Sequence, residues 1–188
     1  MHQPVPSITA STSNSKQVRR LRSIMAAAGG GDQDGEAVVV FRHRNRELIE
    51  NFLRPKIAGE PLPSAAANII HDADVYKSPP DELAARHAPA PGTAVWYFFS
   101  PVHYHQGCRC RRVPCRVAGG GLWWEMGYVE KPVKGSVAGA YQQKLTYYCS
   151  TRPRPEWRMV EYCIPQEDGS EEQMILCKVF RTREASLP

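Results

Sequence analysis

The sequence has no long apolar segment: 42% of its 188 residues are hydrophobic, but polar residues interrupt them throughout. No run approaches the roughly 18 apolar residues that a membrane-spanning helix requires, which excludes such a helix and a membrane partner. No apolar stretch follows the basic cluster at 16–20, so a secretory signal is also excluded. The six cysteines are therefore expected to be free thiols in a reducing compartment.

The sequence also lacks a large charge of either sign and the usual signatures of catalysis. The 24 Lys and Arg residues against 19 Asp and Glu residues leave a net charge of +5, which permits binding to nucleic acid without requiring it. No phosphate loop of the Gly-x4-Gly-Lys type occurs, and none of the six histidines is spaced from a serine or cysteine as a base from its nucleophile. We expect no enzyme activity, no cofactor and no small-molecule substrate.

One cluster carries the nitrogen and sulfur donors of a zinc site, namely His103, His105, Cys108, Cys110 and Cys115. Structural zinc sites join one close pair of cysteines to a second close pair of ligands. The second pair is not evident in this cluster. We therefore expect free thiols on a basic loop, and no metal.

A single domain is expected over residues 37–183, between a tail at 1–36 and a short tail at 184–188. The first tail is rich in Ser, Thr, Gln, Ala and Gly and has no hydrophobic periodicity, so it cannot offset the entropy of ordering and is expected to be disordered. Met25 begins a stretch that resembles an ordinary protein start, and translation is expected to begin there. The basic residues at 16–22 are either a nuclear-import signal or an ordinary solvated segment.

The first half of the domain is expected to contain a short strand and helices. The β-branched run within 36–42 predicts the strand. Apolar residues at 48, 49, 52 and 53 recur at helical spacing, with Asn45 as a cap and Pro55 with Gly59 as the end of the helix. A short amphipathic stretch follows at 67–71, and a further helical turn begins within 79–83.

Strands dominate the second half. Val95–Pro101 is an almost continuous aromatic run ended by a proline, which is typical of a central strand buried on both faces. Further strands are predicted at 141–149, 157–164 and 174–180, each bounded by prolines or by an Asp-Gly turn. Short connections favour antiparallel pairing. We therefore predict an α+β fold, with helices first and an antiparallel β-sheet second.

The functional interpretation centres on residues 116–131. The triple glycine 119–121 removes Cβ where a backbone must turn or approach another surface closely. In the strand that follows, alternation directs Trp123 to the core and Trp124 to the exposed face, until Gly127 interrupts it. The preceding segment 101–120 contains no acidic residue but has Arg109, Arg111, Arg112 and Arg116. A positive loop beside an aromatic strand predicts a contact with nucleic-acid phosphates.

Six sequence blocks, in the same order, resemble the NAC family of plant transcription factors. Trp96–Pro101 matches the family's Trp-Tyr-Phe-Phe-Ser-Pro outright, and Arg116–Trp123 stands where the family has Arg-x-Ala-Gly-x-Gly-Tyr-Trp. The other blocks are Phe41 with Glu47-Leu48 and Lys56–Gly59, then Asp74–Lys77, Trp157–Tyr162 and Leu176–Phe180. The resemblance implies a twisted antiparallel sheet flanked by a few short helices, and a dimeric nuclear regulator that presents the strand after the tryptophan to the DNA major groove, which is wide enough for a strand.

The chain departs from the family's pattern on that strand. Where the resemblance places Lys-Ala-Thr-Gly, this sequence has Trp124-Glu125-Met126-Gly127, so a cation is lost and an anion gained. The anion adds repulsion near phosphates, although a glutamate can accept a hydrogen bond from cytosine N4. Gln142 and Gln143 replace two lysines; they can hydrogen-bond phosphate but release no counterion. The longer, arginine-rich loop before Arg116 is expected to supply phosphate contacts instead.

Two candidate interfaces follow. The predicted contacts to double-stranded DNA are Arg109, Arg111, Arg112, Arg116, Trp124, Glu125, Met126, Gly127, Tyr128, Lys131, Lys134, Gln142, Gln143 and Lys144. The predicted contacts of a homodimer, or of a heterodimer with NAC proteins, are Val38, Val39, Val40, Phe41, Arg42 and Glu47. Val40 occupies the position of the family's dimer arginine, so Arg42 or Arg44 would have to pair with Glu47.

An alternative function is an interaction module of NAC fold whose DNA binding is weakened and which acts by dimerising with other family members. Only eight residues follow Phe180, which favours a repressor, a competitor or a truncated product over a full activator.

Overall fold

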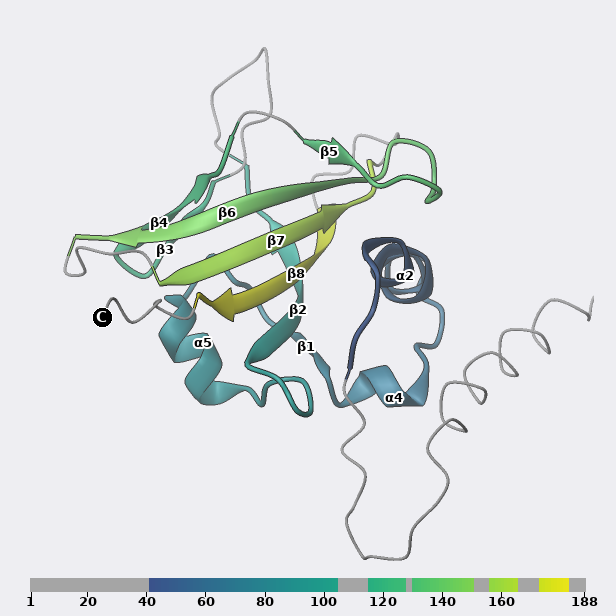
Figure 1. The fold of residues 1–188 in the computed structure, drawn as a ribbon, viewed down its shortest axis with the longest axis horizontal. Coiled ribbons are helices and arrows are strands. Elements are labelled where there is room, and N and C mark those ends of the chain that lie inside the picture. The colour runs from purple at the N-terminus through teal and green to yellow at the C-terminus, as the bar shows by residue number, and fades with distance from the viewer. Residues whose placement is uncertain (1–40, 105–114, 128–129, 151–155, 166–172, 183–188) are drawn as a thin grey trace, which may run out of the picture. The chain divides into compact units, whose positions relative to one another are not determined.

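The computed structural model describes residues 41–104, 115–127, 130–150, 156–165 and 173–182 of the chain. Figure 1 shows an eight-stranded β-sheet with short helices beside it. The predicted α+β class is confirmed, with the difference that the sheet is mixed, because its first strand pairs in parallel. The strand expected within 36–42 lies almost wholly outside the described residues. In the described ranges, no helix has the length and apolarity needed to cross a membrane.

The first helical segment consists of three consecutive pieces: α2 (Asn45–Leu48), the π-helical turn η1 (Ile49–Leu53) and α3 (Arg54–Ile57). Arg44, and not Asn45, is the N-cap. The expectation that Pro55 ends the helix is wrong. Pro55 is the second residue of α3, just after the π-helical turn, where the hydrogen-bond pattern shifts by one residue and can skip a residue that lacks an N–H. Gly59, with a φ of 68°, does follow the last turn as expected.

The region between this helix and the aromatic strand contains a short strand, β1 (Ile70–Asp72), that the sequence did not predict. The expected amphipathic stretch at 67–71 holds the end of α4 (Ser64–Ala67) and the start of β1 (Ile70–Asp72). The helical turn predicted from 79–83 is confirmed as α5 (Pro80–Arg86). Because residues 73–94, which include α5, separate β1 from the next strand, the chain is long enough to return and pair in parallel.

The sheet has the strand order β1-β2-β8-β7-β6-β4-β3, and β5 pairs with β6. Apart from β1, all neighbours are antiparallel. The long strands agree with the predicted ranges to within a residue or two. The strand bounds are β2 Val95–Val102, β3 Val117–Ala118, β4 Gly121–Glu125, β5 Lys131–Pro132, β6 Tyr141–Cys149, β7 Trp157–Cys163 and β8 Gln173–Arg181.

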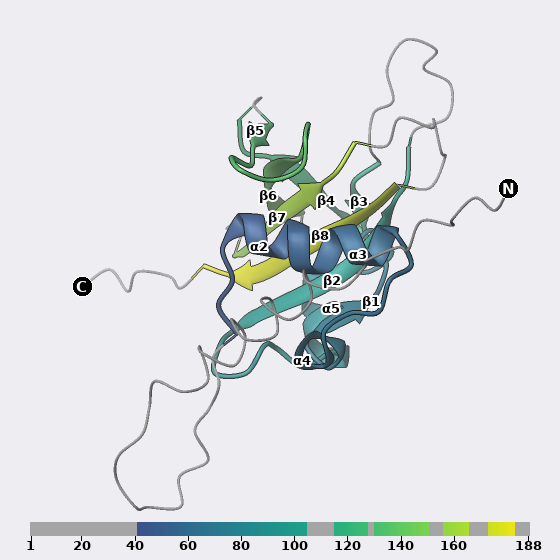
Figure 2. The same cartoon turned by 90° about the vertical axis from the view of Figure 1, so that its right-hand side faces the viewer.

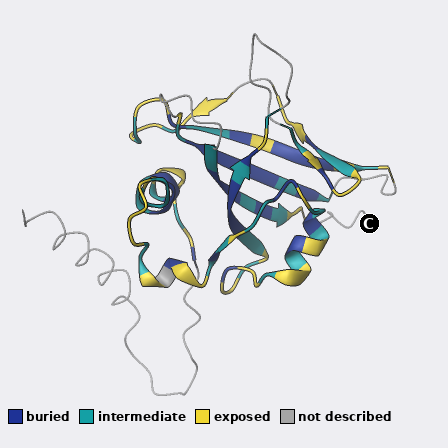
Figure 3. Ribbon diagram, turned by 180° about the vertical axis from the view of Figure 1, so that it is seen from behind, coloured by how far each residue is buried: buried dark blue, intermediate teal, exposed yellow. Residues whose placement is uncertain are grey.

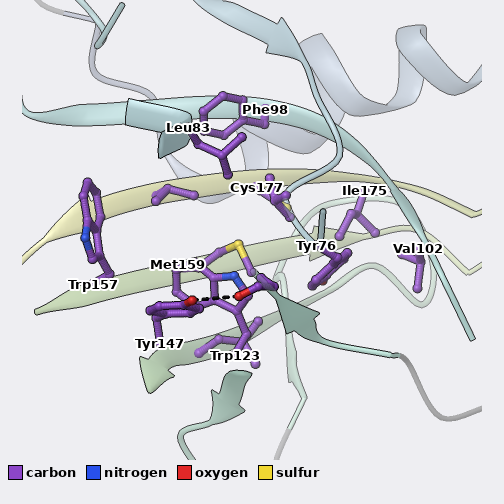
Figure 4. Close-up of a cluster of buried hydrophobic side chains, with 14 of the residues drawn as sticks. Tyr76, Leu83, Phe98, Val102, Trp123, Tyr147, Trp157, Met159, Ile175 and Cys177 are labelled. Carbon is purple, nitrogen blue, oxygen red and sulfur yellow. Dashed lines mark hydrogen bonds between the residues drawn. The ribbon is translucent and has the colours of Figure 1, made fainter. Parts of the chain in front are cut away.

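The sheet separates two hydrophobic cores. On one face, α2, η1 and α3 cross the strands (Figure 2) and bury Leu48 and Phe52 against Tyr97 and Leu176. On the other face, the core includes Leu83 of α5 together with Phe98, Trp123, Tyr147, Trp157 and Met159 (Figure 4). Adjacent residues of β2 enter opposite cores because side chains alternate along a strand. The predicted burial of this strand on both faces is therefore confirmed.

The triple glycine forms the hairpin between β3 and β4. Gly119 and Gly120 are its two loop residues, with φ values of 48° and 78°, which are the left-handed conformations that a tight two-residue hairpin requires. Gly121 serves the second purpose that the sequence suggested, a close approach: a Cβ on Gly121 would lie 2.6 Å from the carbonyl oxygen of Tyr148 and would overlap the Tyr147 hydroxyl. That hydroxyl donates a hydrogen bond of 2.7 Å to the carbonyl oxygen of Ala118.

Replacing Gly121 by alanine is expected to lower the free energy of unfolding by about 1–3 kcal/mol, because the new methyl group must displace Tyr147 or the β6 backbone. Urea denaturation followed by tryptophan fluorescence measures the change. Gly120→Asn is the control, since asparagine tolerates a positive φ and a Cβ at Gly120 meets open space. Equal denaturation midpoints for Gly121→Ala and the wild type would contradict the close approach.

Candidate nucleic-acid interface

The end of β4 lies at an edge of the sheet. β3 covers only the start of β4, where Val117 pairs with Leu122. On that side the N–H of Trp123 still donates to the carbonyl oxygen of Arg116 at 2.9 Å. Beyond Trp123, no strand among the described residues pairs with the outer side of β4. Trp123 is 1% exposed and Trp124 is 59% exposed, which confirms the predicted alternation.

Arg116 binds two carboxylates inside the domain. Its Nη2 lies 2.9 Å from Oε2 of Glu161 and its Nε lies 3.3 Å from Oε1 of the same residue. Its Nη1 pairs with Glu125 of β4. The Arg116 side chain is 13% exposed and that of Glu161 is 3% exposed. The guanidinium that the sequence assigned to phosphate is therefore paired within the fold, and it also pairs with Glu125, whose side chain is 43% exposed.

Tyr76 completes this buried polar cluster by donating its hydroxyl proton to Oε1 of Glu161. Burial, followed by the nearby negative charge of Glu161, raises the pKa of Tyr76, so this hydroxyl remains a donor. Burial, the largest single effect, would lower the pKa of Arg116, but the combined effects of Glu161, Tyr76 and Glu125 outweigh it and the net pKa is raised. Arg116 is thus a permanent cation, and Glu161 is the anion that makes its burial possible.

Three lysines are exposed around the same end of the sheet. Lys131 lies on β5, opposite Gln142 of β6, and Figure 3 shows β5 as exposed. Lys134 follows β5, and Lys144 lies on β6, where its carbonyl oxygen accepts the N–H of Met126 at 2.9 Å. No acidic side chain of the described ranges forms an ion pair with any of the three. Their charges remain available to an anionic ligand.

The two glutamines predicted to contact phosphate have partners within the domain. Gln143 is only 3% exposed, and its Nε2 lies 3.4 Å from the carbonyl oxygen of Gly127. Its amide supports the turn that follows β4 and does not reach the surface. Gln142 accepts a hydrogen bond of 3.0 Å from Nδ2 of Asn45 and so ties β6 to the start of α2.

Tyr76 and Glu161 were not predicted as members of the site. A signal was present for Glu161, because it is an acidic residue flanked by apolar residues in the middle of the strand predicted at 157–164. A buried carboxylate requires a cationic or hydrogen-bonding partner. Nothing in the sequence identified that partner as Arg116, which is 45 residues distant.

Several predicted residues lie outside the described ranges. These are Arg109, Arg111, Arg112 and Tyr128 of the DNA-binding set, and His105, Cys108 and Cys110 of the considered zinc ligands. Of the remaining zinc candidates, His103 places its Nε2 2.6 Å from Oδ2 of Asp74, and Cys115 is a free thiol. Cys163 and Cys177 are buried free thiols as expected, and burial raises the pKa of both. Among the described residues, no three potential ligands gather around a common point.

The predicted dimer residues are mostly occupied within the chain or outside the described ranges. Val38, Val39 and Val40 lie outside them. Phe41 is 8% exposed, and its ring packs 5.1 Å from that of Tyr97. Glu47 accepts the backbone N–H of Arg44 at 3.1 Å, a contact that lowers its pKa. Arg42 is exposed.

Comparison with known proteins connects this fold to one family. The family model described as No apical meristem (NAM) protein matches residues 37–164. The chain is 42% identical over 185 residues to NAC transcription factor 47 of Arabidopsis thaliana, covering 78% of this chain and 49% of that protein. It is 33% identical over 184 residues to NAC domain-containing protein 68 of Oryza sativa subsp. japonica, covering 85% and 55%.

A barley relative, NAC transcription factor NAM-1 of Hordeum vulgare subsp. vulgare, is 35% identical over 133 residues, which is 65% of this chain and 30% of that protein. The chain thus spans about half the length, or less, of the curated relatives that it matches.

Proposed function

This chain belongs to the NAC family, and we propose that it is a NAC-type transcription regulator that binds double-stranded DNA in the nucleus through the β4 edge. The observation that carries this proposal is the position of β4: an edge strand with an outward Trp124, beside three lysines that form no ion pair with an acidic side chain of the described residues. A two-stranded ribbon fits the major groove, and the lysines supply the phosphate contacts that position it.

The residues then divide by task. Trp124, Glu125, Met126 and Gly127 approach the groove, while Lys131, Lys134 and Lys144 contact phosphates together with Arg109, Arg111, Arg112 and Tyr128. Arg116 and Gln143 support β4 from within the domain. Arg116 pairs with Glu125, and Gln143 contacts the carbonyl oxygen of Gly127. Gln142 holds β6 against α2. This division replaces the phosphate role that the sequence suggested for Arg116 and the two glutamines.

We also propose that the chain acts as a dimer through the segment that precedes α2. Arg42 is exposed and the Glu47 side chain is 44% exposed, so both remain accessible to a second chain. Light scattering coupled to size-exclusion chromatography tests this proposal, and a monomer mass at micromolar concentration would contradict it.

A fluorescence-anisotropy titration at several salt concentrations tests DNA binding itself. The probes are duplexes that the protein selects from a random pool and an unselected random duplex. A DNA-binding domain releases counterions, so log K should fall linearly with log salt from about 50 to about 200 mM. Binding that hardly changes with salt and stays near about 10⁻⁴–10⁻⁶ M would leave the interaction-module function as the better explanation.

Replacing Glu125 by lysine is expected to strengthen binding to the selected duplex about tenfold and to steepen the salt slope by about one, because a repelled anion becomes a phosphate contact. Arg116 keeps Glu161 as its partner in this variant. Glu60→Lys is the matched control, an equal charge change at an exposed residue after α3. Unchanged binding by Glu125→Lys would mean that β4 does not face DNA.

A further inference from the structure

In the part of the chain that the structure describes, four large hydrophobic side chains are at least half exposed, and all four lie on or beside the strands β3, β4 and β6. The exposed fractions are 54% for Val117, 59% for Trp124, 53% for Met126 and 50% for Tyr148. The strand register places them on one face, since Val117 pairs with Leu122, Leu122 with Tyr148, and Trp124 with Thr146. Met126 directly follows β4, and its N–H donates to the carbonyl oxygen of Lys144 at 2.9 Å, so the pairing with β6 extends to this residue and places it on the same face.

This face is the one that α2, η1 and α3 cover at the other end of the sheet. There the helices bury Val160 and Tyr162 of β7, whereas at the β4 end Trp124 and Met126 remain exposed. The side chains of Trp123 and Glu125 leave β4 on the opposite face, into the core and toward Arg116. Trp124 and Met126 are therefore the side chains that point outward at the end of β4.

The distance between Trp124 and Met126 along the chain matches the spacing of stacked base pairs. Alternate residues of a strand are about 6.8 Å apart, since each residue advances about 3.4 Å. Base pairs of duplex DNA also follow one another at about 3.4 Å. Trp124 and Met126 can thus meet bases two steps apart, while Lys144, which pairs with Met126 through the 2.9 Å backbone bond, lies within reach of the flanking phosphates.

The functional groups of Trp124 and Met126 limit what these side chains can recognise in the major groove. An indole offers a single N–H donor and a thioether only a weak acceptor, so neither can form the bidentate hydrogen bonds that read guanine or adenine. Apolar side chains in the major groove instead contact the one apolar group displayed there, the methyl group at C5 of a pyrimidine.

We propose that Trp124 and Met126 form an apolar reading surface for pyrimidine C5-methyl groups in the major groove, as displayed by thymine or by 5-methylcytosine. The inference rests on the proposed function, because it requires the β4 edge to face DNA. It assigns to these two residues a specificity that the lysine and threonine of the family's pattern cannot provide.

The test compares duplexes that differ only in this methyl group. The first arm uses the alternating duplexes of dA·dT and dA·dU, and the second uses dG·dC duplexes with and without the C5-methyl group. Each buried methyl group contributes roughly as much as a buried CH₂, so wild-type protein should bind a methylated duplex about fourfold more tightly per methyl contacted. Tighter binding to the dA·dT duplex than to the dA·dU duplex identifies thymine as the recognised base. Tighter binding to the methylated dG·dC duplex identifies 5-methylcytosine.

The double variant Trp124→Lys with Met126→Thr should abolish this ratio while it increases overall affinity and the salt slope. Val117→Thr is the matched control, since Val117 is equally exposed on the same face but lies on β3; it should keep the wild-type ratio. A ratio near one for salt-dependent wild-type binding would overturn the methyl inference and leave DNA binding in place. Failure to bind any of the duplexes, or salt-independent binding to all, would overturn both and favour a protein partner for this face.

Discussion

Replacing Glu161 by alanine is expected to lower the free energy of unfolding by about 3–5 kcal/mol, the largest stability effect predicted for this domain. The substitution removes the carboxylate that accepts from Tyr76 and that lies 2.9 Å from Nη2 of Arg116. The guanidinium would then be buried with only the partly exposed Glu125 as a partner. Thermal unfolding should shift downward by about 10 °C, since each kcal/mol is worth about 2–4 °C for a domain of this size.

Two further variants separate charge from volume. Glu161→Gln keeps the size of the side chain and an oxygen for the Tyr76 hydroxyl, so it should be less destabilising than alanine. Glu60→Ala removes an exposed carboxylate and should stay within about 0.5 kcal/mol of the wild type. If Glu161→Ala unfolded at the same temperature as Glu60→Ala, the cluster of Tyr76, Arg116 and Glu161 would not stabilise the fold.

Replacing Lys131, Lys134 and Lys144 together by glutamine is expected to produce the largest loss of DNA affinity. Three lost phosphate contacts at about 0.9 each reduce the slope of log K against log salt by about 2.7. At about 0.1 M salt this corresponds to a loss of two to three orders of magnitude in affinity. Anisotropy titrations with the selected duplex across a salt series measure both quantities.

A second triple variant controls for net charge. Arg54, Lys77 and Arg86 are exposed cations whose side chains are 64%, 77% and 55% exposed, and each forms an ion pair within the domain. Changing these three to glutamine removes the same charge from other elements and should reduce the salt slope little. Equal losses in the two triple variants would show that affinity follows net charge and not the lysines of the β4 edge.

Much of the fold could be predicted because its signals are local. Val95–Val102 combines an uninterrupted aromatic sequence with a terminal proline, and the strands in the ranges 141–149 and 157–164 are bounded by turn residues. The alternation that separated Trp123 from Trp124 follows from backbone geometry, so it required no tertiary information. The order of motifs also identified the family.

The features that were predicted wrongly or missed depend on tertiary contacts and not on local signals. Pro55 ends an isolated α-helix, but here the helix is held against the sheet through Leu48, Ile49 and Phe52, and a π-helical turn accommodates the proline. β1 is only three residues long and exists because β2 offers it a parallel partner. Short strands of this kind have no sequence pattern of their own.

For the candidate site, the local residue pattern was enough to assign the residue types on the edge strand, namely an outward indole where the family carries a lysine, followed by an acid and a methionine. How their charges are used follows from the folded arrangement alone. Arg116 and Glu161 are far apart in the chain, and burial brings them together because an unpaired guanidinium or carboxylate in the interior would cost several kcal/mol. Long-range pairing of charges depends on which strands become neighbours, and no local pattern of residues specifies that.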